Sequence, residues 1–347
     1  MLFRSLLDVA TMRVHQPPET DSISDMTAKF GLGLAALGRP GYINLGHGSD
    51  LENNYSIRAM EKRAHQVLDE AWQLGVRYFD AARSYGRAEE FLGNWIRDRN
   101  IEHSEITVGS KWGYTYTAAW QVQTPEGVAH EIKRHELKVL KSQYMTSMKS
   151  LGAHLKLYQI HSATLESGVL ENAEVLECLN SLRKIGIRIG LSVSGPAQAA
   201  TIEKAISIKF EEEPLFDSVQ ATWNLLETSA GAALQLAHDA GLHVIVKEGL
   251  ANGRLTSRND EAAFSEKMAV LKNLAAARET SVDALALAVV LNQPWAGTVL
   301  SGACTPEQMR SNFAASTVNC ENVQTQLASI SEPADEYWKF RSSLAWN

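Results

Sequence analysis

The chain has 347 residues, of which 45% are hydrophobic and 21% are charged, and its formal net charge is −7. This balance allows a large core and argues against a nucleic-acid-binding protein, and no apolar run approaches the roughly 20 residues of a membrane helix. Three cysteines without metal-type spacing, Cys178, Cys304 and Cys320, indicate free thiols, so we expect a cytoplasmic protein with no metal site.

Short apolar runs alternate with amphipathic stretches through most of the chain. Residues 1–28 lack a sustained period and are expected to form an irregular leader. The apolar runs lie near residues 30–38, 77–80, 106–111, 155–161, 188–194, 218–224, 243–248 and 297–302, and examples of helical stretches are 57–74, 86–98, 129–150, 172–185, 227–240 and 262–278. Eight strands interleaved with helices predict a single-domain (β/α)8 barrel over residues 29–347, with an aromatic C-terminal tail.

Polar residues stand at the ends of three consecutive predicted strands. The second strand ends on Asp80, with Tyr85 five residues beyond it, the third ends on Lys111, and the fourth ends on His161. Because the C-terminal strand ends of a parallel barrel share one face, we expect these side chains to meet there. Taken singly, Asp80 could be a helix N-cap and His161 a core histidine, but the shared placement favours a catalytic interpretation.

These residue types suit the reduction of a carbonyl group. Hydride transfer to a carbonyl leaves an oxyanion that must be protonated, and a tyrosine can supply the proton although its ordinary pKa is about 10. The ammonium group of Lys111 is expected to lower the pKa of Tyr85, and Asp80 to hold that lysine charged and fixed. His161 is expected to orient the carbonyl oxygen and to share the proton.

Asp80, Tyr85, Lys111 and His161, in this order, resemble the catalytic set of the aldo-keto reductases, and the resemblance runs from about residue 31 to residue 312. It implies a hydride transfer between a nicotinamide and an aldehyde, ketone or sugar, with Tyr85 as the general acid or base. NADP(H) is the favoured cofactor and NAD(H) is possible. The alternative is a cofactor-binding sensor or regulatory subunit on the same barrel. The resemblance leaves the oligomeric state open.

The resemblance assigns the nicotinamide end of the cofactor to strands five to seven. Ser192 matches the serine of the family's Ser-Asn pair, although Val193 replaces the asparagine, and Gln220 on the next strand is expected to bind the carboxamide. Lys247 stands where the family commonly has an aromatic residue, so it could instead lie near the cofactor phosphates or pair with Glu248. The loop expected to cover the pyrophosphate contributes Gly249, Leu250 and Gly253.

The segment after the eighth predicted strand resembles the family's adenosine-binding segment. Thr305 followed by Pro306 predicts a helix N-cap and first turn, which suits an anionic phosphate. Cys304 occupies a position that is often basic in relatives that prefer NADP, which weakens the preference for NADP(H). The cofactor-binding residues expected here are Gly302, Ala303, Gln308 and Asn312.

Residues 112–120, directly after the third predicted strand, combine aromatic and small polar side chains. A loop of this kind at the active face favours a substrate-pocket wall, and we expect Trp112 and Tyr114 to contact the substrate. The alternative is a loop that folds onto the barrel with its aromatic side chains buried.

Overall fold

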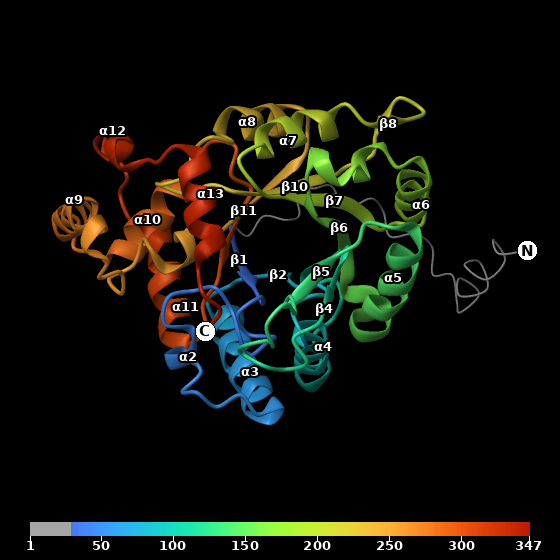
Figure 1. Ribbon diagram of the computed structural model, residues 1–347, viewed down its shortest axis with the longest axis horizontal. Helices are drawn as coiled ribbons and strands as arrows, with labels where there is room; N and C mark the ends of the chain where they lie inside the picture. Colours follow the sequence, from blue (N-terminus) through green and yellow to red (C-terminus); the bar gives the residue numbers. More distant parts are fainter. Residues whose placement is uncertain (1–28) are drawn as a thin grey trace, which may run out of the picture.

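The computed structural model describes residues 29–347, and the predicted leader lies outside the described residues. Eight parallel strands close into a barrel in the order β1-β12-β11-β10-β7-β6-β3-β2 (Figure 1). The strands are β1 (Phe30–Gly33), β2 (Tyr78–Asp80), β3 (Thr107–Trp112), β6 (Leu155–Ala163), β7 (Arg188–Val193), β10 (Ser218–Thr222), β11 (His243–Lys247) and β12 (Thr298–Ser301). Each falls on or overlaps one of the predicted apolar runs, and the predicted (β/α)8 barrel is confirmed.

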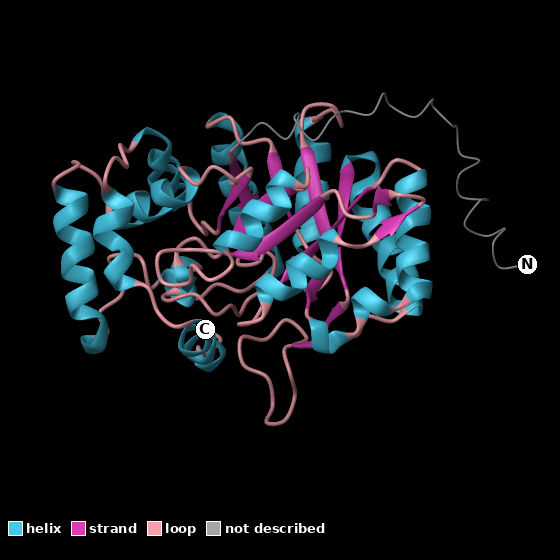
Figure 2. Cartoon of the chain, turned by 90° about the horizontal axis from the view of Figure 1, so that it is seen from above, coloured by secondary structure: helices cyan, strands magenta, loops and turns pink. Residues whose placement is uncertain are grey.

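Helices surround the strands as an outer layer (Figures 1 and 2). Those in this layer are α3 (Ile57–Gln73), α4 (Ala88–Arg99), α5 (Leu137–Leu151), α6 (Ala173–Lys184), α7 (Gln198–Ile206), α8 (Gly231–Asp239), α10 (Val282–Leu291) and α11 (Pro306–Phe313). Further helices are α2 (His47–Asp50), α9 (Ser265–Ala276), α12 (Val323–Leu327) and α13 (Ala334–Ser343). Within residues 29–347, no helix combines the length and the apolar character that crossing a membrane requires.

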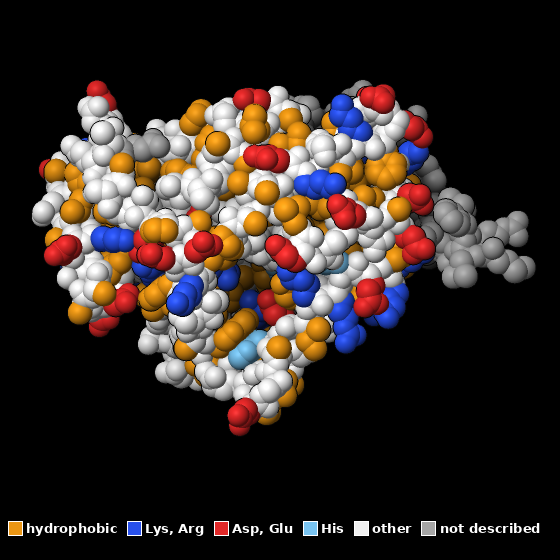
Figure 3. All heavy atoms as spheres, turned by 45° about the horizontal axis from the view of Figure 1, so that its top comes forward, with side chains coloured by type: hydrophobic (Ala, Val, Ile, Leu, Met, Phe, Trp, Pro, Cys, Tyr) orange, Lys and Arg blue, Asp and Glu red, His pale blue; other side chains and the backbone are white. Residues whose placement is uncertain are grey.

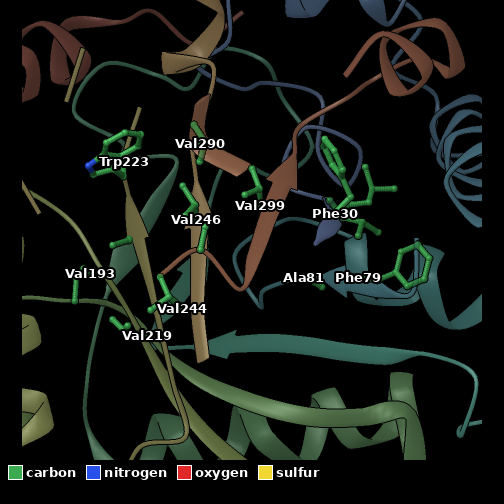
Figure 4. Packing of buried hydrophobic residues seen from close by; sticks show 14 of the residues in the cluster. Phe30, Phe79, Ala81, Val193, Val219, Trp223, Val244, Val246, Val290 and Val299 are labelled. Carbon is green, nitrogen blue, oxygen red and sulfur yellow. The ribbon is translucent and has the colours of Figure 1, made fainter. Parts of the chain in front are cut away.

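The main core lies between the strands and the helices. Figure 4 shows Val193, Val219, Val244 and Val246 there, all at most 1% exposed. β-branched residues pack well on a pleated surface, which is why these short runs form strands. The helices contribute one apolar stripe each, as in α3, whose buried residues are Met60, Ala64, Val67, Leu68 and Ala71.

The interior of the barrel changes from apolar to polar along the strands. Tyr78, Leu157, Ile245 and Leu300 form a separate small cluster of buried side chains. Gly31 makes room for this cluster, because a Cβ atom at Gly31 would come within 2.8 Å of Leu300 and Tyr78. Successive strand side chains alternate between faces, so the residues two positions further along these strands also point inward. Those positions are polar and include Asp80, Gln159 and Lys247.

The structure corrects the predicted helix over residues 129–150. Only its C-terminal part is helical, as α5, while β5 (Glu131–Lys133) pairs antiparallel with β4 (Tyr114–Tyr116) in a hairpin. The two strands pair Thr115 with Ile132, and the outer residues of each strand are partly buried while the central one is exposed. The segment after β3 is therefore one strand of a hairpin beside the barrel mouth. In residues 131–133 the backbone hydrogen bonds of this hairpin form in place of the predicted helix.

Candidate active site

A buried ion pair lies at the C-terminal end of the barrel. Asp80 at the end of β2 is 2% exposed, and Lys111 on β3 is fully buried. The Lys111 Nζ atom pairs with the Asp80 carboxylate, and it also donates hydrogen bonds to the Ala81 carbonyl at 3.0 Å and to the Tyr85 hydroxyl at 3.5 Å. The structure therefore brings together three of the four residues that the strand-end pattern singles out.

The Asp80 carboxylate accepts hydrogen bonds from three further side chains. The Gln220 Nε2 atom lies 2.9 Å from Asp80 Oδ2, the Tyr78 hydroxyl lies 3.2 Å from it, and Gln159 Nε2 lies 3.3 Å from it. Burying a carboxylate is costly unless its oxygens are paired and hydrogen-bonded. These donors hold the carboxylate in place, and Asp80 in turn fixes Lys111 against Tyr85.

A tight turn after β2 carries Tyr85 to this ion pair. Gly86 has a φ of +58°, and a Cβ atom there would lie 2.4 Å from the Gly38 carbonyl oxygen, so glycine is needed at this turn. Burial raises the pKa of Tyr85 well above its ordinary value, and the charge of Asp80 raises it further, whereas Arg39 opposes the shift. The predicted lowering of this pKa is therefore not observed, and Tyr85 keeps its proton at neutral pH.

His161 lies beside Tyr85 at the end of β6. The centroids of the two rings are 5.4 Å apart and nearly perpendicular, and the ring of Tyr114 packs on His161 at 4.9 Å. The His161 Nδ1 atom lies 3.5 Å from the Ser84 hydroxyl oxygen. Burial lowers the pKa of His161 well below its ordinary value, and the charges of Lys111 and Arg39 lower it further, so the imidazole is neutral.

Four histidines, of which His47 and His161 are buried and the other two partly buried, make the stability of the fold sensitive to acid. Burial lowers the pKa of His47, His135 and His243 from 6.5 to about 4, and His161 shifts in the same direction. A base with a lowered folded pKa stabilises the fold above its unfolded pKa, and this contribution is lost on acidification because only the unfolded chain takes up the proton. We expect the free energy of unfolding to fall below pH 6.5 by up to about 1.4 kcal/mol per pH unit for each histidine.

Urea unfolding at a series of pH values between 7.5 and 5 measures this slope. His243→Gln serves as a comparison, because it removes one titrating group whose Nε2 atom contacts the Thr298 hydroxyl oxygen at 2.9 Å. In the variant, the unfolding free energy should change less steeply with pH, by about the contribution of one histidine. A free energy of unfolding that stays constant over this range would contradict the expectation.

An elongated cavity of about 600 Å³ opens above the cluster. Figure 3 shows the hollow on one face of the molecule, with basic and acidic side chains inside it. At one end the cavity is lined by Asp80, Tyr85, His161 and Tyr114, and at the other it reaches the start of α11. Its volume is in the range that accommodates a small-molecule ligand or cofactor.

Most residues predicted to bind the cofactor line this cavity. They are Gln220, Lys247, Gly249, Leu250, Gly253, Gly302, Ala303, Gln308 and Asn312. The predicted N-cap of α11 is also present, since the Thr305 hydroxyl accepts a hydrogen bond from the Gln308 amide. Asn312 is fixed by a 2.9 Å hydrogen bond from its Nδ2 atom to the Ser301 hydroxyl.

Ser192 and Trp112 do not lie where the sequence analysis expected. Neither is among the described residues that line the cavity. The Ser192 hydroxyl is buried and accepts a hydrogen bond at 2.8 Å from the amide of Ser162, which has a φ of +52° at the end of β6. Trp112 is fully buried in the main core, with its ring 5.6 Å from that of His135. Ser194, rather than Ser192, reaches the cavity.

Arg39 is a cavity residue that the sequence analysis missed. It follows the first predicted strand directly and is 3% exposed. Its Nη1 atom donates hydrogen bonds to the Ser84 carbonyl at 3.1 Å and to Glu131 at 2.8 Å. The guanidinium carbon lies 5.3 Å from the Tyr85 ring centroid, within cation–π range. An arginine immediately after an apolar run is the signal that could have identified it.

The C-terminal segment forms part of the cavity wall. Tyr42 and Asn347 exchange two backbone hydrogen bonds of 3.1 and 3.0 Å, and we call this contact the strap. The ring of Trp346 stacks on His130 with centroids 4.0 Å apart and packs on Arg39 at 4.7 Å. The aromatic tail therefore reaches the cavity mouth, and Trp346 is one of the lining residues.

A second ion pair lies at the α11 end of the cavity. Arg258 donates two hydrogen bonds to Asp50, at 2.8 and 2.6 Å. The pair is close to Cys304, whose Sγ atom lies 3.7 Å from the Nδ1 atom of His47, a residue in the same short helix as Asp50. Burial raises the pKa of the Cys304 thiol, and the charge of Asp50 raises it further, whereas Arg258 opposes the shift. Asp50, Arg258 and Cys304 all line the cavity. Arg258 is therefore a basic group close to Cys304, the residue at whose position the sequence analysis noted the absence of a basic side chain.

Comparison with known proteins agrees with the barrel fold. The chain matches the Aldo/keto reductase family over residues 43–332. A solved structure of aldo-keto reductase AKR11C1 from Bacillus halodurans, in its holo form, superposes with a TM-score of 0.66 at 18% identity, covering 88% of this chain and 93% of that one. The chain belongs to the aldo/keto reductase family.

Similar curated proteins are oxidoreductases. The chain is 26% identical to the uncharacterized oxidoreductase YqkF of Bacillus subtilis, covering 75% of this chain and 84% of that protein. It is 23% identical to the NADH-specific methylglyoxal reductase of Escherichia coli, covering 88% and 94%. It is 24% identical to the L-glyceraldehyde 3-phosphate reductase of the same species, covering 83% and 85%. Membership of the family and these relatives support an oxidoreductase.

Proposed function

We propose that this protein is a nicotinamide-dependent reductase of small carbonyl compounds, with Tyr85 as the general acid. The observation that carries the proposal is the buried cluster of Asp80, Lys111, Tyr85 and His161 at one end of the elongated cavity. A protonated tyrosine, a lysine held beside it and a neutral histidine are the groups needed to protonate a developing alkoxide. In the oxidative direction the same groups would accept the proton.

The cavity fits a dinucleotide cofactor, which would supply the hydride. A Cβ atom at Gly302 would meet no other atom within 4 Å, so the cavity passes directly over the backbone after β12. Gln220 would hold the nicotinamide end, which would lie beside Lys247. Gln308 and Asn312 would contact the adenosine, and the loop from Gly249 to Gly253 would cover the pyrophosphate.

Each member of the cluster has a separate role in this proposal. Tyr85 donates its phenolic proton to the substrate oxygen, and Lys111 stabilises the resulting phenolate through the hydrogen bond that it already donates to the Tyr85 oxygen. Asp80 keeps the buried ammonium group charged and oriented. His161, which is neutral, contributes a ring nitrogen that orients the carbonyl oxygen, while its Nδ1 atom contacts the Ser84 hydroxyl.

A substrate panel tests the proposed function. The names of two relatives, a methylglyoxal reductase and an L-glyceraldehyde 3-phosphate reductase, suggest short aldehydes as the first candidates. Loss of reduced-nicotinamide absorbance should be followed with NADPH and with NADH for each aldehyde. Binding of either cofactor without turnover of any carbonyl or alcohol in the panel would instead favour a sensor or regulatory subunit.

We propose NADP(H) as the preferred cofactor, with Arg258 as the group that would bind its 2′-phosphate. In the structure Arg258 is engaged by Asp50, so a 2′-phosphate would compete with that carboxylate. We therefore expect Asp50→Asn to raise the affinity for NADPH relative to NADH by about 10- to 100-fold, as expected for a charge-assisted hydrogen bond. Arg258→Met should lower the same ratio.

Quenching of tryptophan fluorescence measures both dissociation constants in each variant. Arg278→Met is a matched control, because Arg278 donates its hydrogen bonds to the carbonyls of Leu274, Asn319 and Glu321 and does not line the cavity. An NADPH-to-NADH affinity ratio that is the same in wild type, Asp50→Asn and Arg258→Met would remove this ion pair from cofactor selection.

A further inference from the structure

Most of the charged groups that line the cavity form ion pairs, whereas Asp283 accepts a hydrogen bond from Ser311. Asp80 pairs with Lys111, Glu131 with Arg39, Asp50 with Arg258, and Glu248 with Arg341. Lys247 has no carboxylate to itself, because it lies 3.8 Å from a Glu248 oxygen and Arg341 also pairs with Glu248. These two cations and one carboxylate leave a local excess of one positive charge in this part of the cavity wall.

Lys247 is held in place by Thr222 and by a carboxylate, that of Glu248, which it shares with Arg341. Its Nζ atom donates a 2.7 Å hydrogen bond to the Thr222 hydroxyl and lies 3.8 Å from the nearer Glu248 oxygen. The Arg341 Nε atom donates to one Glu248 oxygen at 2.8 Å, and its Nη2 atom donates to the other. The Lys247 side chain is 16% exposed. The group of Lys247, Glu248 and Arg341 therefore carries a net charge of about +1 in a largely buried setting.

This excess charge lies at the catalytic end of the cavity. Lys247 pairs in register with Thr222 in the barrel, two residues beyond Gln220, whose amide reaches Asp80. The charge of Lys247 is also one of those that lower the pKa of His161. The ion pair of Asp50 and Arg258, in contrast, lies at the Cys304 end.

We propose that Lys247 is an anion subsite, and that the preferred carbonyl substrate carries a carboxylate or phosphate group that binds there. An excess of buried positive charge is costly, and an anionic ligand reduces that cost while gaining a charge-assisted hydrogen bond. The inference rests on the proposed carbonyl reduction and adds the substrate class. The same chemistry is present in the cofactor pyrophosphate, but the position of Lys247 beside the catalytic cluster favours the substrate as the source.

Matched aldehydes test the subsite. The 3- and 4-carboxybenzaldehydes have neutral counterparts of nearly the same shape, the 3- and 4-carbamoylbenzaldehydes, and the two isomers place the charge at different distances from the carbonyl group. We expect the wild type to reduce the better carboxylate isomer with a kcat/KM at least about 10-fold above that of its amide. Lys247→Met should remove this preference through KM, and Lys247→Arg should retain most of it.

Calorimetric titration of the same aldehydes in the presence of oxidised cofactor gives the binding preference without turnover. Lys267→Met is the control, since Lys267 pairs with Glu332 away from the cavity and should leave the preference unchanged. Equal binding of acid and amide by the wild type, or equal loss of both in Lys247→Met, would overturn the subsite. A Lys247→Met variant that keeps the preference but binds both cofactors more weakly would assign the charge to the cofactor instead. Carboxylate-selective binding without any turnover would contradict the proposed function alone.

Discussion

Replacing Tyr85 by phenylalanine is expected to lower kcat for carbonyl reduction by about 10²–10⁴-fold, the usual contribution of a general acid. The change keeps the ring that packs on His161 and Arg39 and removes only the hydroxyl that Lys111 contacts. Cofactor affinity should be almost unchanged, because the phenol lies with the catalytic cluster. Single-turnover rates and cofactor titrations measure the two quantities separately.

Tyr144→Phe provides the comparison, since Tyr144 packs on Tyr158 and does not line the cavity. Its activity should match that of the wild type. If Tyr85→Phe kept a kcat within about a factor of two of the wild type, Tyr85 would not be the acid.

Lys111→Met should reduce both stability and activity. The substitution leaves the Asp80 carboxylate buried with only neutral donors, and removing one partner of a buried ion pair costs about 3–5 kcal/mol. Turnover should fall as well, because the phenolate that forms during reduction loses its stabilising ammonium group. Urea unfolding gives the first effect, and kcat measured under conditions where the variant is folded gives the second.

The double variant Asp80→Asn with Lys111→Met separates the charge effect from packing. It leaves no unpaired buried charge, so it should be more stable than Lys111→Met alone, and the coupling free energy follows from the cycle. Lys204→Met is the surface control, because Lys204 is 41% exposed and pairs with Glu171, and it should change stability by less than about 1 kcal/mol. A double variant no more stable than the single one would contradict a charge-based coupling.

The strand pattern predicts the barrel and the catalytic cluster because both depend on local periodicity. Alternation along a strand fixes which side chains point inward, and parallel strands bring their C-terminal ends to one face. Gln220, in contrast, was expected at the cavity from the resemblance to the family and not from this pattern. Local periodicity does not mark α10, where all residues except Asp283 are buried, because a helix surrounded by core has no polar face and so no amphipathic period.

The missed cavity residues depend on contacts that no local pattern encodes. Arg39 and Glu131 are 92 positions apart, and Glu248 and Arg341 are 93 apart. Each contact joins a loop or hairpin at the barrel mouth to another segment, and loop geometry is set by tertiary packing. Trp112 was wrongly expected at the pocket for a related reason. It belongs to β3, so its side chain takes the outward direction that alternates with that of Lys111.

The strap between Tyr42 and Asn347 divides the cavity wall into two parts of unequal rigidity. The barrel side is held by eight hydrogen-bonded strands, whereas this side is closed by contacts of the last residues of the chain. These are the strap, the hydrogen bonds of Asn347 with Asn44 and of Trp346 with Gln123, and the packing of Trp346 on His130 and Arg39. Segments with few buried contacts open locally at a small fraction of the global unfolding free energy. A ligand can therefore enter and leave by local opening of the strap, while Asp80 and Lys111 keep their positions throughout the exchange.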